Sequence, residues 1–163
     1  MTQRISSDIK RKIREKLKDI PEQLKVVGPL IENLCEKGWS LDQIVFGKRE
    51  WRIPKTPSEQ TKREKGQSFD GFPVDITVFD APEHRGDFRH ILFLIECKQP
   101  TEEAGLAQLE SYFIGEPYAQ LGIFANNPAA ESNAIFIYRK SDGSIINKRR
   151  KIKDLPLPGE AIA

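Results

Sequence analysis

The sequence has few of the residues that form disulfides or bind soft metals. Its 163 residues include two cysteines and two histidines. Cys35 and Cys97 lie in apolar patterns, with neither a Cys-x-x-Cys spacing nor clustered histidine beside them. We therefore expect two reduced packing residues and no zinc site.

Long apolar segments are also missing. No run approaches the roughly 18 apolar residues that a membrane span requires. The N-terminal residues 1–8 lack the apolar core of a signal peptide. We therefore expect a cytoplasmic protein with no membrane partner.

No strong excess of one charge is present either. The formal net charge is +2, which does not by itself indicate nucleic-acid binding. The distribution is uneven, however, with local basic clusters at residues 10–12, 62–65 and 148–151. Each cluster alone is most simply a solvated face, but together around one site they would be able to follow a phosphate backbone.

What is present fits one ordinary globular domain. Hydrophobic residues make up 38% and charged residues 31% of a chain long enough to bury a core.

The chain is organised around residues 73–98. Two apolar runs, 73–79 and 91–98, are rich in β-branched and aromatic residues, and a polar stretch at 84–87 separates them. This pattern predicts a β-hairpin.

Three charged residues lie inside these apolar strands: Asp75, Glu96 and Lys98. Charged groups are rarely buried unless they are paired or bind a metal. Because strand side chains alternate between faces, Glu96 and Lys98 share one face, and the hairpin can bring Asp75 onto it. Two carboxylates beside an ammonium group are suited to Mg²⁺ and a phosphate.

A second motif follows on a predicted helix that opens at residues 100–103 with Thr101 as its N-cap. Its apolar stripe is formed by Leu106, Leu109 and Phe113. Gln108 and Tyr112, four residues apart, share the flank beside that stripe. In isolation they would most simply be boundary residues with local hydrogen bonds.

Together, Asp75, Glu96-Cys97-Lys98 and the Gln108-x-x-x-Tyr112 pair resemble the signature of the PD-(D/E)XK nucleases. The Gln-x-x-x-Tyr branch includes recombination helicase-nucleases and the R subunit of type I restriction enzymes. Over residues 20–140 the chain is most similar to the N-terminal nuclease domain of that R subunit. Asp75 follows Pro73-Val74 rather than directly following a proline.

The resemblance implies a restriction-endonuclease-like α/β fold, with a central mixed sheet flanked by helices. It implies that Asp75, Glu96 and the Cys97 backbone carbonyl hold Mg²⁺ or Mn²⁺, and that Lys98 orients water or the developing oxyanion. Gln108 and Tyr112 would position Lys98 or the DNA. An opening-helix glutamate also reaches the metal in this family; we assign Glu22, with Glu32 as the rival, although a carboxylate at a helix N-terminus is also favoured by the helix dipole.

The remaining elements are read from periodicity and turn residues. We expect helices over 8–18 and 22–37, the latter ending near Gly38 and open to a kink at Gly28-Pro29. Strands are expected at 44–53, 119–125, 134–138 and 145–146, with a mobile loop at 54–68. The expected organisation is a basic helical extension (1–20), a nuclease-like domain (21–150) and a linker-like tail (151–163).

The resemblance implies a metal-dependent endonuclease that acts on double-stranded DNA. No Gly-x-x-x-x-Gly-Lys-Ser/Thr motif is present. We therefore expect either the N-terminal piece of a larger protein, which would work with a translocating motor and with methylation and specificity subunits, or a free-standing nuclease-like domain; the linker-like tail favours the first. The alternative is a nuclease fold that has lost catalysis and binds DNA or protein. A small-molecule enzyme is disfavoured because the sequence has no nucleotide fingerprint or nucleophile-base pair.

Overall fold

Six strands form one open sheet in the computed structural model, which describes residues 5–97, 102–160 and 162 but not the side chains of Glu22, Arg49 and residues 102–105. The strands follow the chain in order and are β1 (Ile44–Ile53), β2 (Phe72–Phe79), β3 (Ile91–Glu96), β4 (Leu121–Phe124), β5 (Asn133–Arg139) and β6 (Ile145–Lys151). The β3–β4 pair is parallel, and the other neighbouring pairs are antiparallel. The sheet is therefore mixed and mostly antiparallel, as expected for the coarse fold class.

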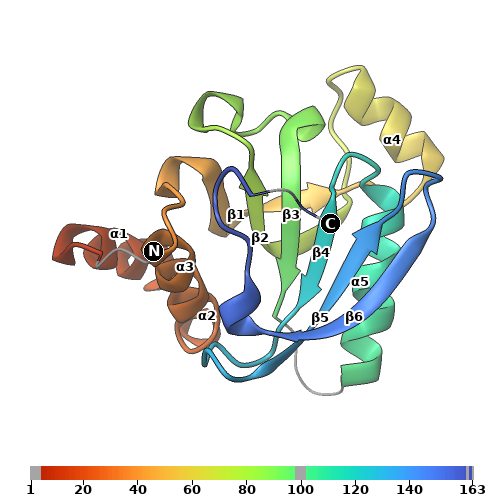
Figure 1. Cartoon of the computed structure of the whole chain (residues 1–163). Coiled ribbons are helices and arrows are strands. Elements are labelled where there is room, and N and C mark those ends of the chain that lie inside the picture. Colours follow the sequence, from red (N-terminus) through yellow and green to blue (C-terminus); the bar gives the residue numbers. More distant parts are fainter. Residues whose placement is uncertain (1–4, 98–101, 161, 163) are drawn as a thin grey trace.

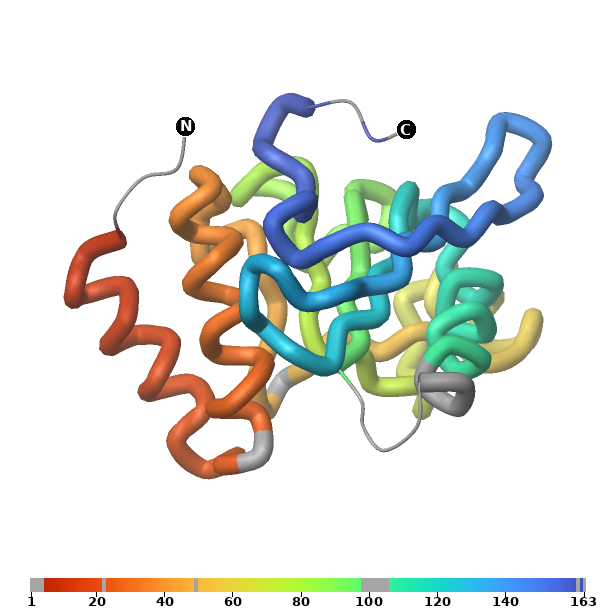
Figure 2. The backbone as a smooth tube through the Cα atoms, turned by 60° about the horizontal axis from the view of Figure 1, so that its bottom comes forward, coloured from red at the N-terminus to blue at the C-terminus, as the bar shows by residue number. Residues whose placement is uncertain are grey.

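Helices cover both faces of this sheet (Figures 1 and 2). They are α1 (Ser7–Leu17), α2 (Pro21–Leu24), α3 (Val27–Glu36), α4 (Pro57–Glu64) and α5 (Glu102–Gly115). The 3₁₀ turns are η1 (Leu41–Gln43), η2 (Pro82–His84), η3 (Phe88–His90) and η4 (Ile152–Asp154). Helix α5 lies between β3 and β4 in the chain, because parallel neighbours need a crossover connection.

Two hydrophobic clusters follow from the alternation of strand side chains. In β3, Phe93 and Ile95 pack with α1 and α3, whereas Leu94 packs with Leu109 and Phe113 of α5. The helices lie on opposite sides of the sheet for this reason, with α3 and α5 well separated in Figure 2. None of the helices among the described residues is long and apolar enough to cross a membrane.

The central hairpin forms as the sequence predicts. Strands β2 and β3 pair antiparallel with Ile76 opposite Ile95 and Thr77 opposite Leu94. The predicted bounds of β1 also agree with the structure. Within β1, Gly47 has a φ of 89°, and the register with β2 shifts between Phe46 and Trp51. A glycine suits that bulge because left-handed backbone disfavours other residues.

The stretch at 54–68, expected to be a mobile loop, instead contains helix α4. Thr56 caps its first turn by accepting a hydrogen bond from the Glu59 N–H, and Pro57 occupies the first helical position. The prediction was wrong because α4 buries no apolar stripe. Its anchor is an ion pair between Arg63 and Glu116 at 2.5 Å, with side chains 9% and 0% exposed.

The predicted helix over 22–37 is two helices, and the break differs from the expected kink. It falls at Lys25-Val26, between α2 and α3, rather than at Gly28-Pro29. Pro29 is the third residue of α3, where a backbone N–H has no partner within the helix, so the proline is tolerated. Gly38 follows α3 with a φ of 108°, consistent with the expected stop.

The two ends of the chain pack on the core where they are described. Ile13 and Leu17 of α1 are buried against α3, so the basic segment carries part of the core. Ile152 and Leu155 are also buried, and the Trp39 indole N–H donates to the Pro156 carbonyl at 2.8 Å. Residues 152–156 thus differ from the linker expected over 151–163, because apolar residues between the charges anchor them.

Both cysteines are free thiols on the α1–α3 side of the sheet. Cys35 is buried and Cys97 is half-buried. Burial raises the pKa of Cys35 to about 11, so its thiol stays protonated and unreactive at neutral pH. The predicted packing role agrees with this placement.

Candidate functional site

The open end of the β2–β3 hairpin brings Asp75 and Glu96 together. Continuing the observed register by one residue places Asp75 opposite Glu96 on the face covered by α5. The Cys97 N–H donates to an Asp75 oxygen at 2.7 Å and to a Glu96 oxygen at 3.2 Å. Because both carboxylates contact one nitrogen, their oxygens can be no farther apart than the sum of these distances.

A third carboxylate, Glu50 of β1, lies in the segment between Phe46 and Trp51 where the register with β2 shifts. Its charge acts on Tyr112 together with the charges of Asp75 and Glu96, and the Asp75 charge acts in turn on Glu50. We call Glu50, Asp75 and Glu96 the carboxylate row.

Tyr112 from α5 lies over this row. It is 1% exposed, and its side chain hydrogen-bonds that of Glu96. Burial, together with the charges of Glu96, Asp75 and Glu50, raises the pKa of Tyr112 well above its usual value. The phenol therefore stays protonated and donates to the Glu96 carboxylate.

The electrostatics of the row favour a cation. Burial raises the pKa of Glu50, and the Asp75 charge adds to the shift, although Arg52 opposes it. The Arg52 guanidinium lies 4.0 Å from Glu50 and half of that side chain is exposed, so the ion pair is weak. Glu96 is 1% exposed. Crowded carboxylates destabilise one another unless they share a proton or a positive charge.

The donor set is made of carboxylate oxygens, which are the ligands that Mg²⁺ and Mn²⁺ prefer. A hollow of about 520 Å³ adjoins Glu50. Its walls include Trp51 and Arg52 of β1, Arg63 of α4 and Phe88 from the β2–β3 connection. Glu50 therefore borders open space large enough for part of a substrate.

No family model, curated protein or solved structure matches the chain.

The structure leaves several of the expected site residues untested. Lys98 lies outside the described residues, as does the expected helix cap Thr101. Gln108 is half-buried one helical turn before Tyr112, and among the described residues it forms no hydrogen bond with the carboxylate row. The metal role of the Cys97 carbonyl stays a prediction. The Cys97 backbone N–H contacts both carboxylates.

The role of an opening-helix glutamate stays a prediction. Glu22 lies in α2, at a helix start as expected, but its side chain is not described. Glu32 lies in α3, on the opposite face of the sheet from Tyr112. The third carboxylate is Glu50, which the sequence analysis missed. The signal was available, because Glu50 is a carboxylate inside a predicted strand, as Asp75 and Glu96 are.

The three basic clusters lie on α1, α4 and β6, and α1 and α4 are on opposite sides of the molecule (Figure 1). Some of their charges have intramolecular partners: Arg63 pairs with Glu116, and Arg11 pairs with Asp8 at 2.6 Å. Lys151 pairs with Glu131 at 3.3 Å. These clusters are therefore not one continuous basic surface, and any phosphate contacts would use the remaining cations.

Proposed function

We propose that this chain is a metal-dependent DNA endonuclease domain of the PD-(D/E)XK type. The observation that carries the proposal is the carboxylate row: Asp75 and Glu96 share the Cys97 N–H, and Tyr112 hydrogen-bonds Glu96. These are the motif residues that the sequence resemblance singled out. They come from separate segments of the chain, and a purely local role for each would not require them to meet.

In this proposal Asp75 and Glu96 hold Mg²⁺ or Mn²⁺, with Glu50 as a further oxygen donor. The ion would supply an activated water and charge stabilisation at the scissile phosphate. Tyr112 fixes the orientation of the Glu96 carboxylate, and the Cys97 N–H holds both carboxylates in place. Lys98 is assigned to the attacking water or the developing oxyanion, and Gln108 to positioning.

The wider context is proposed from the sequence resemblance alone. The domain would serve as the nuclease domain of a type I restriction R protein or a related restriction-modification protein. It would act on double-stranded DNA with a helicase or translocase motor and with methylation and specificity subunits. Local basic residues would contribute phosphate contacts with little base preference.

The proposal is tested by plasmid nicking with the whole chain, in Mg²⁺ or Mn²⁺, against Asp75→Asn. Asparagine keeps an acceptor for the Cys97 N–H but removes the charge, so the variant should fold. We expect metal-dependent nicking to fall by on the order of 10²-fold or more, as is typical when a group that stabilises transition-state charge is lost. The matched control is Asp70→Asn, at an exposed position five residues earlier.

Two results would separate the alternatives. Equal nicking by Asp75→Asn and the parent would overturn the assigned role. Salt-sensitive DNA binding without cleavage, by the chain alone and by a chain joined to a motor, would favour a nuclease fold that has lost catalysis, since phosphate contacts weaken as salt rises.

A further inference from the structure

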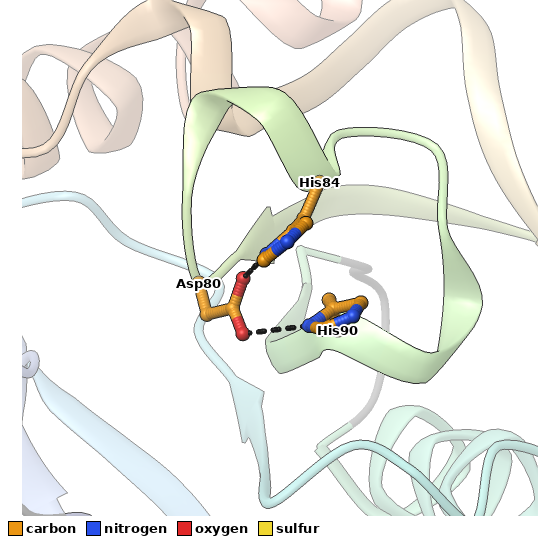
Figure 3. A group of neighbouring side chains, drawn as sticks. All are labelled: Asp80, His84 and His90. Carbon is orange, nitrogen blue, oxygen red and sulfur yellow. Dashed lines mark hydrogen bonds and ion pairs between the residues drawn. The ribbon is translucent and has the colours of Figure 1, made fainter.

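The connection between β2 and β3 brings both histidines of the chain onto one aspartate (Figure 3). Asp80 directly follows β2, His84 ends η2, and His90 ends η3 directly before β3. The His84 Nδ1 lies 2.6 Å from one Asp80 oxygen, and the His90 Nδ1 lies 2.9 Å from the other. The two imidazole rings stack with their centroids 3.7 Å apart.

The backbone holds these three residues in a fixed arrangement. The Asp80 N–H donates to the His90 carbonyl at 3.0 Å, which closes the connection at its base. The Asp87 N–H donates to the His84 carbonyl at 3.0 Å, and the His90 N–H donates to the Asp87 carbonyl at 2.9 Å. Gly86, with a φ of 92°, allows the turn between the two histidines. Little ordering is therefore left for a ligand to impose.

The donor set is that of a transition-metal site. One ligand atom from each of Asp80, His84 and His90 lies within 4.8 Å of the other two. Zn²⁺ binds histidine nitrogens and carboxylate oxygens at about 2.0–2.2 Å, so ligand atoms around one ion stand roughly 3–4 Å apart. Small side-chain rotations would open the present hydrogen bonds to that spacing.

The chemistry and exposure of the side chains also suit an ion. A neutral imidazole offers a nitrogen lone pair to a metal. The side chains are 36–38% exposed, so an ion can enter from solvent and keep water as a remaining ligand.

We propose that Asp80, His84 and His90 bind one transition-metal ion of the Zn²⁺ class, separate from the carboxylate row. The proposal departs from the sequence-based expectation of no zinc site, which rested on the absence of clustered histidine. It does not depend on the proposed nuclease activity. Its effect would be to brace the β2–β3 connection, because the ion would join the two strands where the chain reverses.

The test is titration of the whole, chelator-stripped chain with Zn²⁺ by calorimetry and with Co²⁺ by its visible absorption. We expect one Co²⁺ per chain with a nitrogen-ligand spectrum, and at least a tenfold loss of affinity in each of Asp80→Asn, His84→Ala and His90→Ala. Asp87→Asn is the matched control, because the Asp87 carboxylate is farther from a histidine nitrogen, at 3.9 Å. Circular dichroism of each variant checks folding.

A second experiment removes the other candidate metal site, the carboxylate row. In Asp75→Asn, Co²⁺ binding should persist with the same spectrum, because the carboxylate row supplies only oxygen ligands. No saturable binding of either ion, or binding that survives all three ligand substitutions, would overturn the proposal. Binding lost in Asp75→Asn alone would assign the ion to the carboxylate row instead.

Discussion

The two ends of the β2–β3 hairpin carry different chemistry on the same pair of strands. At the open end, Glu50, Asp75 and Glu96 form a row under Tyr112, and Glu96 is almost completely buried. At the connection, Asp80 meets two half-exposed histidines. Asp75 and Asp80 are five residues apart, or roughly 16 Å along a strand, so the two groups act separately.

The difference shows how burial and ligand type select an ion. Oxygen ligands alone suit hard cations such as Mg²⁺, whereas imidazole favours Zn²⁺ and its neighbours. A cation would offset repulsion among the carboxylates of the row, of which Glu96 is buried, while each Asp80 oxygen already has an imidazole partner. We therefore expect the row to depend strongly on a bound cation and the connection to depend on one weakly.

The largest expected effect is a double dissociation between the two ends. Glu96→Gln should lower nicking by on the order of 10²- to 10³-fold and leave Co²⁺ binding at the connection unchanged. Asp80→Asn should weaken Co²⁺ binding at the connection and leave nicking unchanged. Loss of both activities in either variant would show that the two ends are one coupled site.

An intermediate effect is expected from Tyr112→Phe. The change keeps the ring in the core but removes the hydroxyl that hydrogen-bonds Glu96. Losing a group that orients a ligand typically costs 10–100-fold in metal affinity or activity. Mg²⁺-dependent nicking should fall by about that factor, and Co²⁺ binding at the connection should not change.

Tyr118→Phe is the matched control, because Tyr118 is 41% exposed and packs edge-on against Phe88. Equal nicking by Tyr112→Phe and Tyr118→Phe would mean that Tyr112 serves only to fill the core.

The sequence predicted the open end far better than the connection. Asp75 and Glu96 interrupt apolar strands, and an unexplained charge in a strand is visible in the sequence. Glu50 gives the same signal, but its approach to Asp75 depends on how β1 lies against β2, which no local pattern fixes. The histidines gave no signal, because a polar loop conceals which of its side chains converge.

Helix α4 and residues 152–156 were missed for a related reason. Neither shows an apolar period, and long-range contacts help to hold both, together with the buried Ile152 and Leu155 in the second segment. Arg63 of α4 reaches Glu116 at the end of α5, and the Trp39 indole reaches the Pro156 carbonyl. Periodicity predicts which face of an element is buried, but a lone ion pair or hydrogen bond depends on the completed fold.

The smallest expected effect is the pH dependence of the stability that the β2–β3 connection contributes in the absence of metal. The hydrogen bond to Asp80 raises the pKa of His84 above 6.5. Burial works to raise the pKa of Asp80, but the hydrogen bonds from His90 and His84 outweigh it and lower that pKa below 3.8. Glu83 and Asp87 also face His84 and favour its charged form.

The directions of the two pKa shifts define a window of pH in which the pair stabilises the fold. Because the folded-state pKa of His84 is raised, its contribution to stability is fully present below pH 6.5 and is lost as pH rises through that pKa. Because the pKa of Asp80 is lowered, its contribution is present above pH 3.8 and is lost as pH falls through that pKa. The pair should therefore stabilise the fold most between these two values.

The melting temperatures of the parent and His84→Ala, measured in chelator across pH 3 to 9, check this window. Inside this pH range we expect the parent to melt less than about 4 °C higher than His84→Ala, since exposed ion pairs are weak. At lower or higher pH the difference should be smaller. Glu83→Gln, at an exposed neighbouring position, should show a smaller difference. A His84→Ala difference that is constant with pH would mean that His84 contributes packing rather than charge. Added Zn²⁺ should enlarge the difference between the parent and His84→Ala at pH values above the raised pKa of His84, where its imidazole is neutral and able to bind the ion.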